Sequence, residues 1–150
     1  MTWQTIAIPL VQGFEQCRLV AYHGEADPPG LYTCGWGSTG PDVTAKTVWT
    51  QAQADARFLS DLNKFAAAVD ALVKVPLTDH QKAALVSFAY NEGDHALAGS
   101  TLLRMLNNRD YHGAAMQFLL WNKANGVVVN GLKNRRLKEQ TVFNTPDAQP

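Results

Sequence analysis

The sequence predicts an α+β fold: a small β-containing N-terminal lobe joined by a long helix to a mostly helical C-terminal lobe. Three observations favour it. Residues 19–48 are rich in glycine and proline among residue types that prefer strands. Apolar residues then recur at helical spacing over residues 58–72, and amphipathic patterns continue to about residue 143. A chain of 150 residues with 46% hydrophobic content can form one domain with its own core.

The long helix is indicated by a stripe whose steps alternate between four and three residues. Such a stripe lies on one buried helix face and is formed by Phe58, Leu62, Phe65, Val69 and Leu72. Two capping boxes, Thr50 with Gln53 and Thr78 with Gln81, place helix starts near residues 51 and 79. We therefore expect an N-terminal lobe at about residues 15–60 and a helical C-terminal lobe at about residues 75–143.

Shorter helices are expected in the C-terminal lobe. Residues 101–106, 111–121 and 132–143 each form an amphipathic pattern, and stretches containing asparagine and glycine connect them. Residues 144–150 are expected to be a frayed tail.

Composition excludes several classes of function. Thirteen basic and thirteen acidic residues give no net field to hold a nucleic acid. Cys17 and Cys34 form neither a disulfide framework nor a metal-binding spacing, so reduced thiols are expected. The first fourteen residues lack the basic region of a secretory signal, and no apolar run is long enough to span a bilayer. We expect a soluble protein made in the cytoplasm.

Acidic residues that could carry chemistry are concentrated in residues 14–38. Glu15 follows Phe14 at the end of an expected first helix, whereas Glu25 and Asp27 lie in a polar turn before two prolines. Cleavage of a glycosidic bond needs one protonated carboxylic acid and a second, ionised carboxylate. Glu15, in the more apolar setting, is the candidate acid, although acidic residues in turns are usually only solvated.

Two other motifs in this region are discounted. Gly35, Gly37 and Gly40 spell the dinucleotide-binding pattern G-x-G-x-x-G, but Pro41 follows and no βαβ unit surrounds them. His23 alternates with two acidic residues as metal ligands can, but no second cluster completes a site. No metal and no cofactor are expected.

Residues 15–37 resemble the catalytic segment of phage-type lysozymes, glycoside hydrolase family 24. The family pattern is a glutamate, an apolar strand with tyrosine, an aspartate, a glycine and T-x-G-x-G. It is filled by Glu15, Arg18, Leu19, Tyr22, Asp27, Gly30, Thr33, Gly35 and Gly37. Segments beginning at Pro76, Ser100, Gly113 and Gly131 also resemble the family in its order, so the resemblance covers nearly the whole chain.

The resemblance implies a lysozyme-like fold and a set of site residues. Glu15, Asp27 and Thr33 would be catalytic, and Tyr90 and Asn91 would contact the substrate from a helix that faces the cleft. The densest basic cluster is Lys133, Arg135 and Arg136. A solvated helix face is its default interpretation, but near a cleft it could hold carboxylates of the wall's stem peptide.

Two departures from the family pattern matter. Eleven residues separate Glu15 from Asp27, about three more than in the family, so Glu25 inside the insertion is an alternative second carboxylate. Ser38 stands where many members have a histidine that pairs with an acid. A hydrogen bond from Ser38 could replace part of that pair.

By this resemblance the protein is expected to be an endolysin-like muramidase. It would cleave peptidoglycan between N-acetylmuramic acid and N-acetylglucosamine by an inverting mechanism, as a monomer without a cofactor, and lyse the host cell. From the host cytoplasm it would reach the cell wall through a separate holin-type pore, with no stable membrane insertion. The alternatives are a lytic transglycosylase and a catalytically idle wall-binding or toxin domain on the same scaffold.

Overall fold

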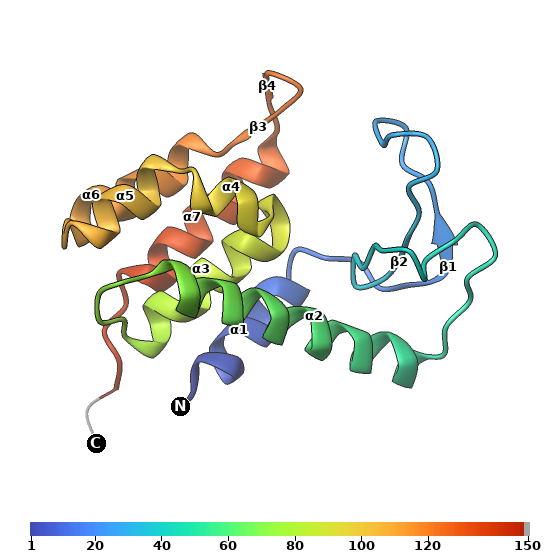
Figure 1. Ribbon diagram of the computed structural model, residues 1–150, viewed down its shortest axis with the longest axis horizontal. Coiled ribbons are helices and arrows are strands. Elements are labelled where there is room, and N and C mark those ends of the chain that lie inside the picture. Colours follow the sequence, from blue (N-terminus) through green and yellow to red (C-terminus); the bar gives the residue numbers. More distant parts are fainter. Residues whose placement is uncertain (149–150) are drawn as a thin grey trace. The chain divides into compact units, whose positions relative to one another are not determined.

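The computed structural model describes residues 1–148 and confirms the predicted α+β class. Helices predominate and accompany two small antiparallel sheets (Figure 1). The chain divides into two compact units. Residues Glu15–Lys64 form what we call the β unit, and Met1–Phe14 together with the chain from Phe65 onward form the helical unit. Helix α2 (Gln51–Leu72) contributes residues to both.

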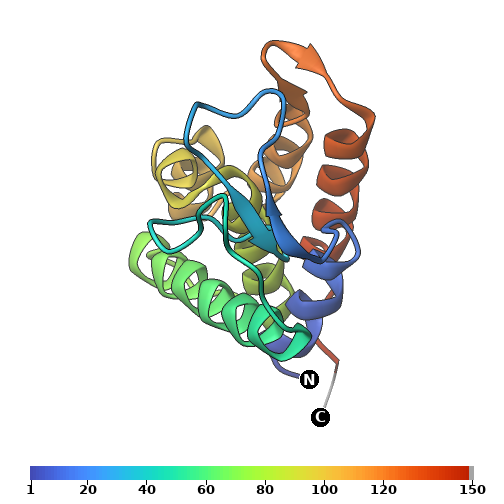
Figure 2. The same ribbon diagram turned by 90° about the vertical axis from the view of Figure 1, so that its right-hand side faces the viewer.

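The β unit contains the first sheet. Strands β1 (Arg18–Tyr22) and β2 (Thr33–Gly35) pair antiparallel (Figure 2). Tyr22 lies opposite Thr33, and an irregularity interrupts the register between the paired ends. A single bridge joins Val20 to Val48. Strands therefore form where glycine, proline and strand-preferring residues alternate, as predicted.

Both capping boxes form, and they start helices α2 and α3 (Asp79–Glu92) at the predicted residues. The backbone N–H of Thr50 donates to Gln53 Oε1 at 2.8 Å, and the Gln53 N–H donates to Thr50 Oγ1 at 3.1 Å. Thr78 and Gln81 make the same reciprocal pair before α3. Each box satisfies two N–H groups that the first helical turn leaves without a partner.

Helix α3 is the core of the helical unit. All residues from Ala83 to Ala89 are buried, which is the burial of a helix covered on every side. It packs against α1 (Trp3–Gln12) and α7 (Asn130–Phe143). The helical unit is thus built around one central helix.

The remaining helices of this unit are α4 (Asp94–Ala98), α5 (Thr101–Asn107), α6 (Tyr111–Gln117) and the 3₁₀ turn η1 (Phe118–Leu120). Helices α5 and α6 lie side by side (Figure 1). Helix α4 was not predicted. One helix was expected over residues 111–121. Instead α6 ends at Gln117, and the 3₁₀ turn η1 follows it and ends before Trp121.

A hairpin that sequence analysis treated as a connection joins η1 to α7. Strands β3 (Lys123–Ala124) and β4 (Val127–Val128) pair antiparallel around Asn125 and Gly126. Both turn residues have positive φ angles, 52° and 78°. Asn-Gly is the dipeptide that two-residue hairpin turns of this kind prefer.

The prediction of a frayed tail is wrong for the chain up to Asp147, which is held by hydrogen bonds. Its carboxylate accepts the backbone N–H groups of Asp79 and His80 at 2.9 and 3.1 Å and pairs with the His80 ring at 2.7 Å. These bonds satisfy N–H groups of the first turn of α3. The final part of the expected tail, residues 149–150, lies outside the described residues.

Candidate active site

Glu15 lies in the connection between α1 and β1. Helix α1 ends at Gln12, and the backbone N–H groups of Gly13 and Phe14 still donate to Pro9 and Val11 in its last turn. Glu15 is half-buried and lies outside the helix, whereas sequence analysis placed it at the helix end. It begins the β unit.

Asp27 lies in the loop between β1 and β2, where local contacts fix its carboxylate. The N–H of Gly24 donates to Asp27 Oδ2 at 2.8 Å, and the Asp27 N–H donates to the Gly24 carbonyl at 3.0 Å. A Cβ at Gly24 would lie 2.7 Å from Oδ2. Any larger residue there would displace the carboxylate, so glycine is the residue that lets it close on the backbone.

The exit of this loop is also closed by hydrogen bonds. The N–H of Leu31 donates to the Pro28 carbonyl at 3.2 Å, and His23 Nδ1 lies 2.8 Å from the Leu31 carbonyl oxygen. Glu25 is exposed in the turn between Gly24 and Asp27. The two candidate carboxylates thus differ, because Asp27 is partly buried and held by its own turn while Glu25 points from the surface of the loop.

Thr33 begins β2, opposite Tyr22 at the end of β1. Its neighbour Cys34 is fully buried, and the backbones of Cys34 and Ser38 exchange two hydrogen bonds of 2.9 Å. Thr33 and Asp27 therefore belong to one hairpin, whose first strand begins three residues after Glu15. All three predicted catalytic residues lie in the β unit.

Ser38, which stands where many family members have a histidine, makes a hydrogen bond to an acidic residue. Its buried hydroxyl donates to Asp61 Oδ2 on α2 at 2.6 Å, and the other Asp61 oxygen accepts Arg57 Nε at 2.9 Å. Burial opposes ionisation of Arg57, but its ion pairs with Asp61 and Asp42 together raise its pKa above the ordinary value. This connection fixes the turn after β2 to α2.

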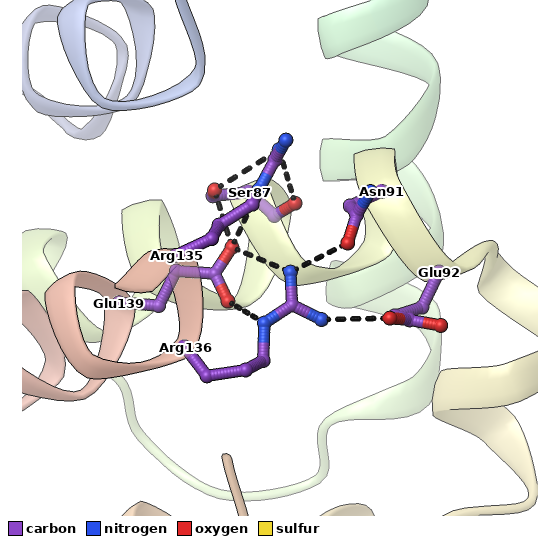
Figure 3. A network of polar contacts seen from close by, with 6 residues as sticks. All are labelled: Ser87, Asn91, Glu92, Arg135, Arg136 and Glu139. Carbon is purple, nitrogen blue, oxygen red and sulfur yellow. Dashed lines mark hydrogen bonds and ion pairs between the residues drawn. The ribbon is translucent and has the colours of Figure 1, made fainter. Parts of the chain in front are cut away.

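Arg135 and Arg136 lie inside the helical unit, with 3% and 0% of their surfaces exposed (Figure 3). Arg136 Nε pairs with Glu139 Oε1 at 2.7 Å, and Nη1 pairs with Glu92 at 2.9 Å. Arg135 Nε and the Ser87 hydroxyl both donate to Glu139 Oε2. Burial lowers the pKa of Arg136 and raises that of Glu139, while their mutual attraction acts in the opposite direction on both.

The solvated helix face expected for Lys133, Arg135 and Arg136 is therefore wrong for the two arginines. Their guanidinium groups bind groups within the helical unit instead of solvent. Lys133 is exposed. Of the three, it is the residue whose charge remains available to a ligand carboxylate.

Asn91 is tied to this network. Its Oδ1 accepts Arg136 Nη2 at 2.7 Å, as Figure 3 shows. A guanidinium can only donate, so this contact fixes the orientation of the amide and directs its NH₂ group away from Arg136. Tyr90 packs its ring edge against Phe65, with ring centroids 5.6 Å apart. Tyr90 thus has a packing role, and Asn91 has an amide donor held in place.

Over residues 1–148 no group of three or more histidine, cysteine or acidic side chains could hold a metal ion. Cys17 and Cys34 are both free thiols, and Cys34 is buried. In that same part of the chain no helix combines the length and apolar character needed to cross a bilayer.

Comparison with known proteins identifies the family of the chain. The sequence profile described as phage lysozyme matches residues 12–139. The endolysin of Bacillus phage B103 is 42% identical over 142 residues, which are 95% of this chain and 54% of that protein. The SAR-endolysin of Escherichia phage Mu is 42% identical over 125 residues, 83% of this chain and 72% of the relative. The chain thus spans about half the length of the first of these relatives.

Two solved structures superpose closely. The muramidase domain of SpmX from Asticaccaulis excentricus has a TM-score of 0.84 at 34% identity, covering 94% of this chain and 96% of that domain. A mutant of P22 lysozyme has a TM-score of 0.79 at 34% identity, covering 97% of this chain and 99% of the other. The family profile, the sequence relatives and the solved structures all match nearly the whole of this chain. The chain therefore belongs to the phage lysozyme family.

Proposed function

We propose that this chain is an endolysin-like muramidase that hydrolyses the bond between N-acetylmuramic acid and N-acetylglucosamine in peptidoglycan. The observation that carries the proposal is the β unit itself, where a held Asp27 and Thr33 share one hairpin directly after Glu15. Membership of the phage lysozyme family supports it. The names of relatives, endolysins and a muramidase domain, point to the same activity.

In the proposed inverting mechanism the three residues have distinct roles. Glu15 donates its proton to the glycosidic oxygen as the bond breaks. Asp27 accepts a proton from a water molecule on the opposite face of the sugar, and the Thr33 hydroxyl orients that water. A base must be held within a fraction of an ångström to act efficiently. The Gly24 N–H provides such a restraint for Asp27 and favours it over the exposed Glu25.

We propose that the helical unit supplies substrate contacts. Because Arg136 holds Asn91 Oδ1, the free NH₂ group of Asn91 can donate to the carbonyl of an N-acetyl group. Tyr90 would provide an apolar wall, and exposed Lys133 would attract a carboxylate of the stem peptide. Arg135 and Arg136 act in this proposal through the buried network, not through direct contact with substrate.

The cellular context is also proposed. The protein would act as a monomer, accumulate in the host cytoplasm and reach the wall after a separate holin-type pore opens the membrane, which would lead to lysis.

Product analysis tests the proposal directly. Purified peptidoglycan is digested with the protein, and the new glycan ends are identified by mass spectrometry. Hydrolysis adds one water to each cleaved bond and leaves reducing N-acetylmuramic acid. A lytic transglycosylase leaves anhydro ends that are one water lighter, and finding those would replace this proposal with the transglycosylase. Intact glycan, with no loss of turbidity in permeabilised cells, would indicate the catalytically idle scaffold.

A further inference from the structure

The surface formed by residues 111–138 carries charge of one sign. This stretch contains no aspartate or glutamate, although the chain has thirteen. Its lysines, Lys123, Lys133 and Lys138, are exposed. The next acidic residue, Glu139, is fully buried. The exposed charged side chains within this stretch are therefore all positive.

The same stretch also exposes large apolar side chains. Six of the eleven large hydrophobic residues found exposed in the described chain fall here: Met116, Leu120, Val127, Val128, Val129 and Leu137. Leu120 and Val127 are each 66% exposed. Scattered exposed hydrophobic residues need no explanation, but a concentration in one segment indicates a binding surface.

These side chains come from neighbouring elements. Gln140 Nε2 on α7 donates to the Ala115 carbonyl on α6 and lies 3.7 Å from Met116 Sδ. Leu137 is three residues before Gln140 and therefore lies on the same side of α7. Leu120 lies in η1, which packs against α7. The three elements α6, η1 and α7, which carry Met116, Leu120 and Leu137, thus pack against one another.

The β3–β4 hairpin extends this surface. The N–H of Val129 donates to the Asn122 carbonyl at 2.9 Å and closes the base of the hairpin, which projects from the helices in Figure 2 (orange). Lys123 pairs with Val128 across the hairpin, so their side chains lie on the same face. A positive charge and an aliphatic side chain are therefore adjacent on this projecting hairpin.

We propose that the hairpin, with Val127 on one face and Lys123 and Val128 on the other, acts together with the exposed Leu120, Val129 and Leu137 to bind bilayers that contain anionic phospholipids. These six residues are here called the hairpin surface. Lysines are attracted to anionic headgroups, and aliphatic side chains gain free energy on entering the acyl boundary. A glycan strand offers no acyl region in which valine and leucine side chains can be buried. A second copy of the chain would present the same positive charge and repel it. The inference does not depend on the proposed hydrolysis.

Vesicle sedimentation tests the inference with the whole protein. One set of vesicles contains phosphatidylcholine alone, and the other contains phosphatidylcholine and phosphatidylglycerol in equal parts. We expect the protein to sediment with the anionic vesicles more strongly than with the neutral ones, and added salt to release it. The Val127→Asn/Val128→Asn variant should bind the anionic vesicles at least about tenfold more weakly.

Matched controls separate the hairpin surface from general exposure. Val20→Asn/Val48→Asn replaces two valines of the β unit that are 61% and 66% exposed, close to the values of 51% and 66% in the hairpin pair. It should bind vesicles as the parent does, while Lys123→Gln should weaken binding to anionic vesicles only. Circular dichroism confirms that each variant is folded.

The inference is overturned if the parent does not bind anionic vesicles, or if the hairpin variant binds them as well as the parent does. It is also overturned if the hairpin variant loses binding to purified peptidoglycan while vesicle binding stays unchanged. That result would make the hairpin a site for wall glycan.

Discussion

Replacing Glu139 with glutamine tests how much of the stability depends on the buried arginines. The change keeps the size of the side chain but removes the negative charge that Arg135 and Arg136 share. Breaking a buried ion pair by removing one partner costs roughly 3–5 kcal/mol, because the remaining charge is left uncompensated away from water. Arg136 keeps its ion pair with Glu92, so we expect the lower end, about 3 kcal/mol.

Urea unfolding followed by circular dichroism measures this free energy. A loss of about 3 kcal/mol would lower the melting temperature by roughly 6–12 °C in a protein of this size. Lys138→Gln, one residue away and exposed, is the matched control and should change stability by less than about 0.5 kcal/mol. If Glu139→Gln and Lys138→Gln unfold at the same urea concentration, the buried network does not stabilise the fold as we describe.

Three further predictions concern single side chains. Asp27→Asn should abolish most hydrolysis and Glu25→Gln should leave it largely intact, as measured by glycan release; the reverse result would move the second carboxylate to Glu25. Thr33→Val should lose much of the rate and Thr33→Ser should retain part of it, with unchanged melting temperatures; a fully active valine variant would make Thr33 a packing residue. Hydrogen bonds from the His80 ring and the α3 backbone lower the pKa of Asp147 below its ordinary 3.8. Its stabilising contribution is therefore complete above pH 3.8 and is lost as pH falls through the lowered pKa. Asp147→Asn should then melt below the parent at neutral pH and no longer differ from it in strong acid; a gap that persists in acid would refute this assignment.

The parts of the fold that sequence analysis predicted well depend on local signals. The capping boxes at Thr50 and Thr78 join residues that are three apart in the sequence. The sequence pattern is therefore sufficient to predict these hydrogen bonds. The Asn125-Gly126 turn was not predicted, although it is an equally local signal: the dipeptide stands before a run of valines.

Burial of the two arginines could not be predicted in this way. The i,i+4 spacing of Arg135 and Glu139 is visible in the sequence, but such pairs usually lie on solvated faces. The pair of Arg135 and Glu139 is buried because α7 packs on α3. Ser87 on α3 donates to Glu139, from which it is separated by 52 positions in the sequence. The Asp147 contact with His80 spans 67 residues and is hidden for the same reason.

The catalytic assignments came from resemblance to the family, and they stay predictions. The structure adds to them the restraints on Asp27, the Ser38 hydrogen bond to Asp61 and the orientation of Asn91. None of these contacts follows from residue spacing, because each depends on how a loop closes or how two elements pack.

The general acid role of Glu15 is the central claim, and the rate of glycan cleavage by Glu15→Gln tests it most directly. Glutamine keeps the shape of the side chain but has no acidic proton to give to the leaving oxygen. We expect reducing ends to be released from purified peptidoglycan at least about 100-fold more slowly than by the parent, with an unchanged circular dichroism spectrum and melting profile. Release within tenfold of the parent rate would remove Glu15 from the mechanism.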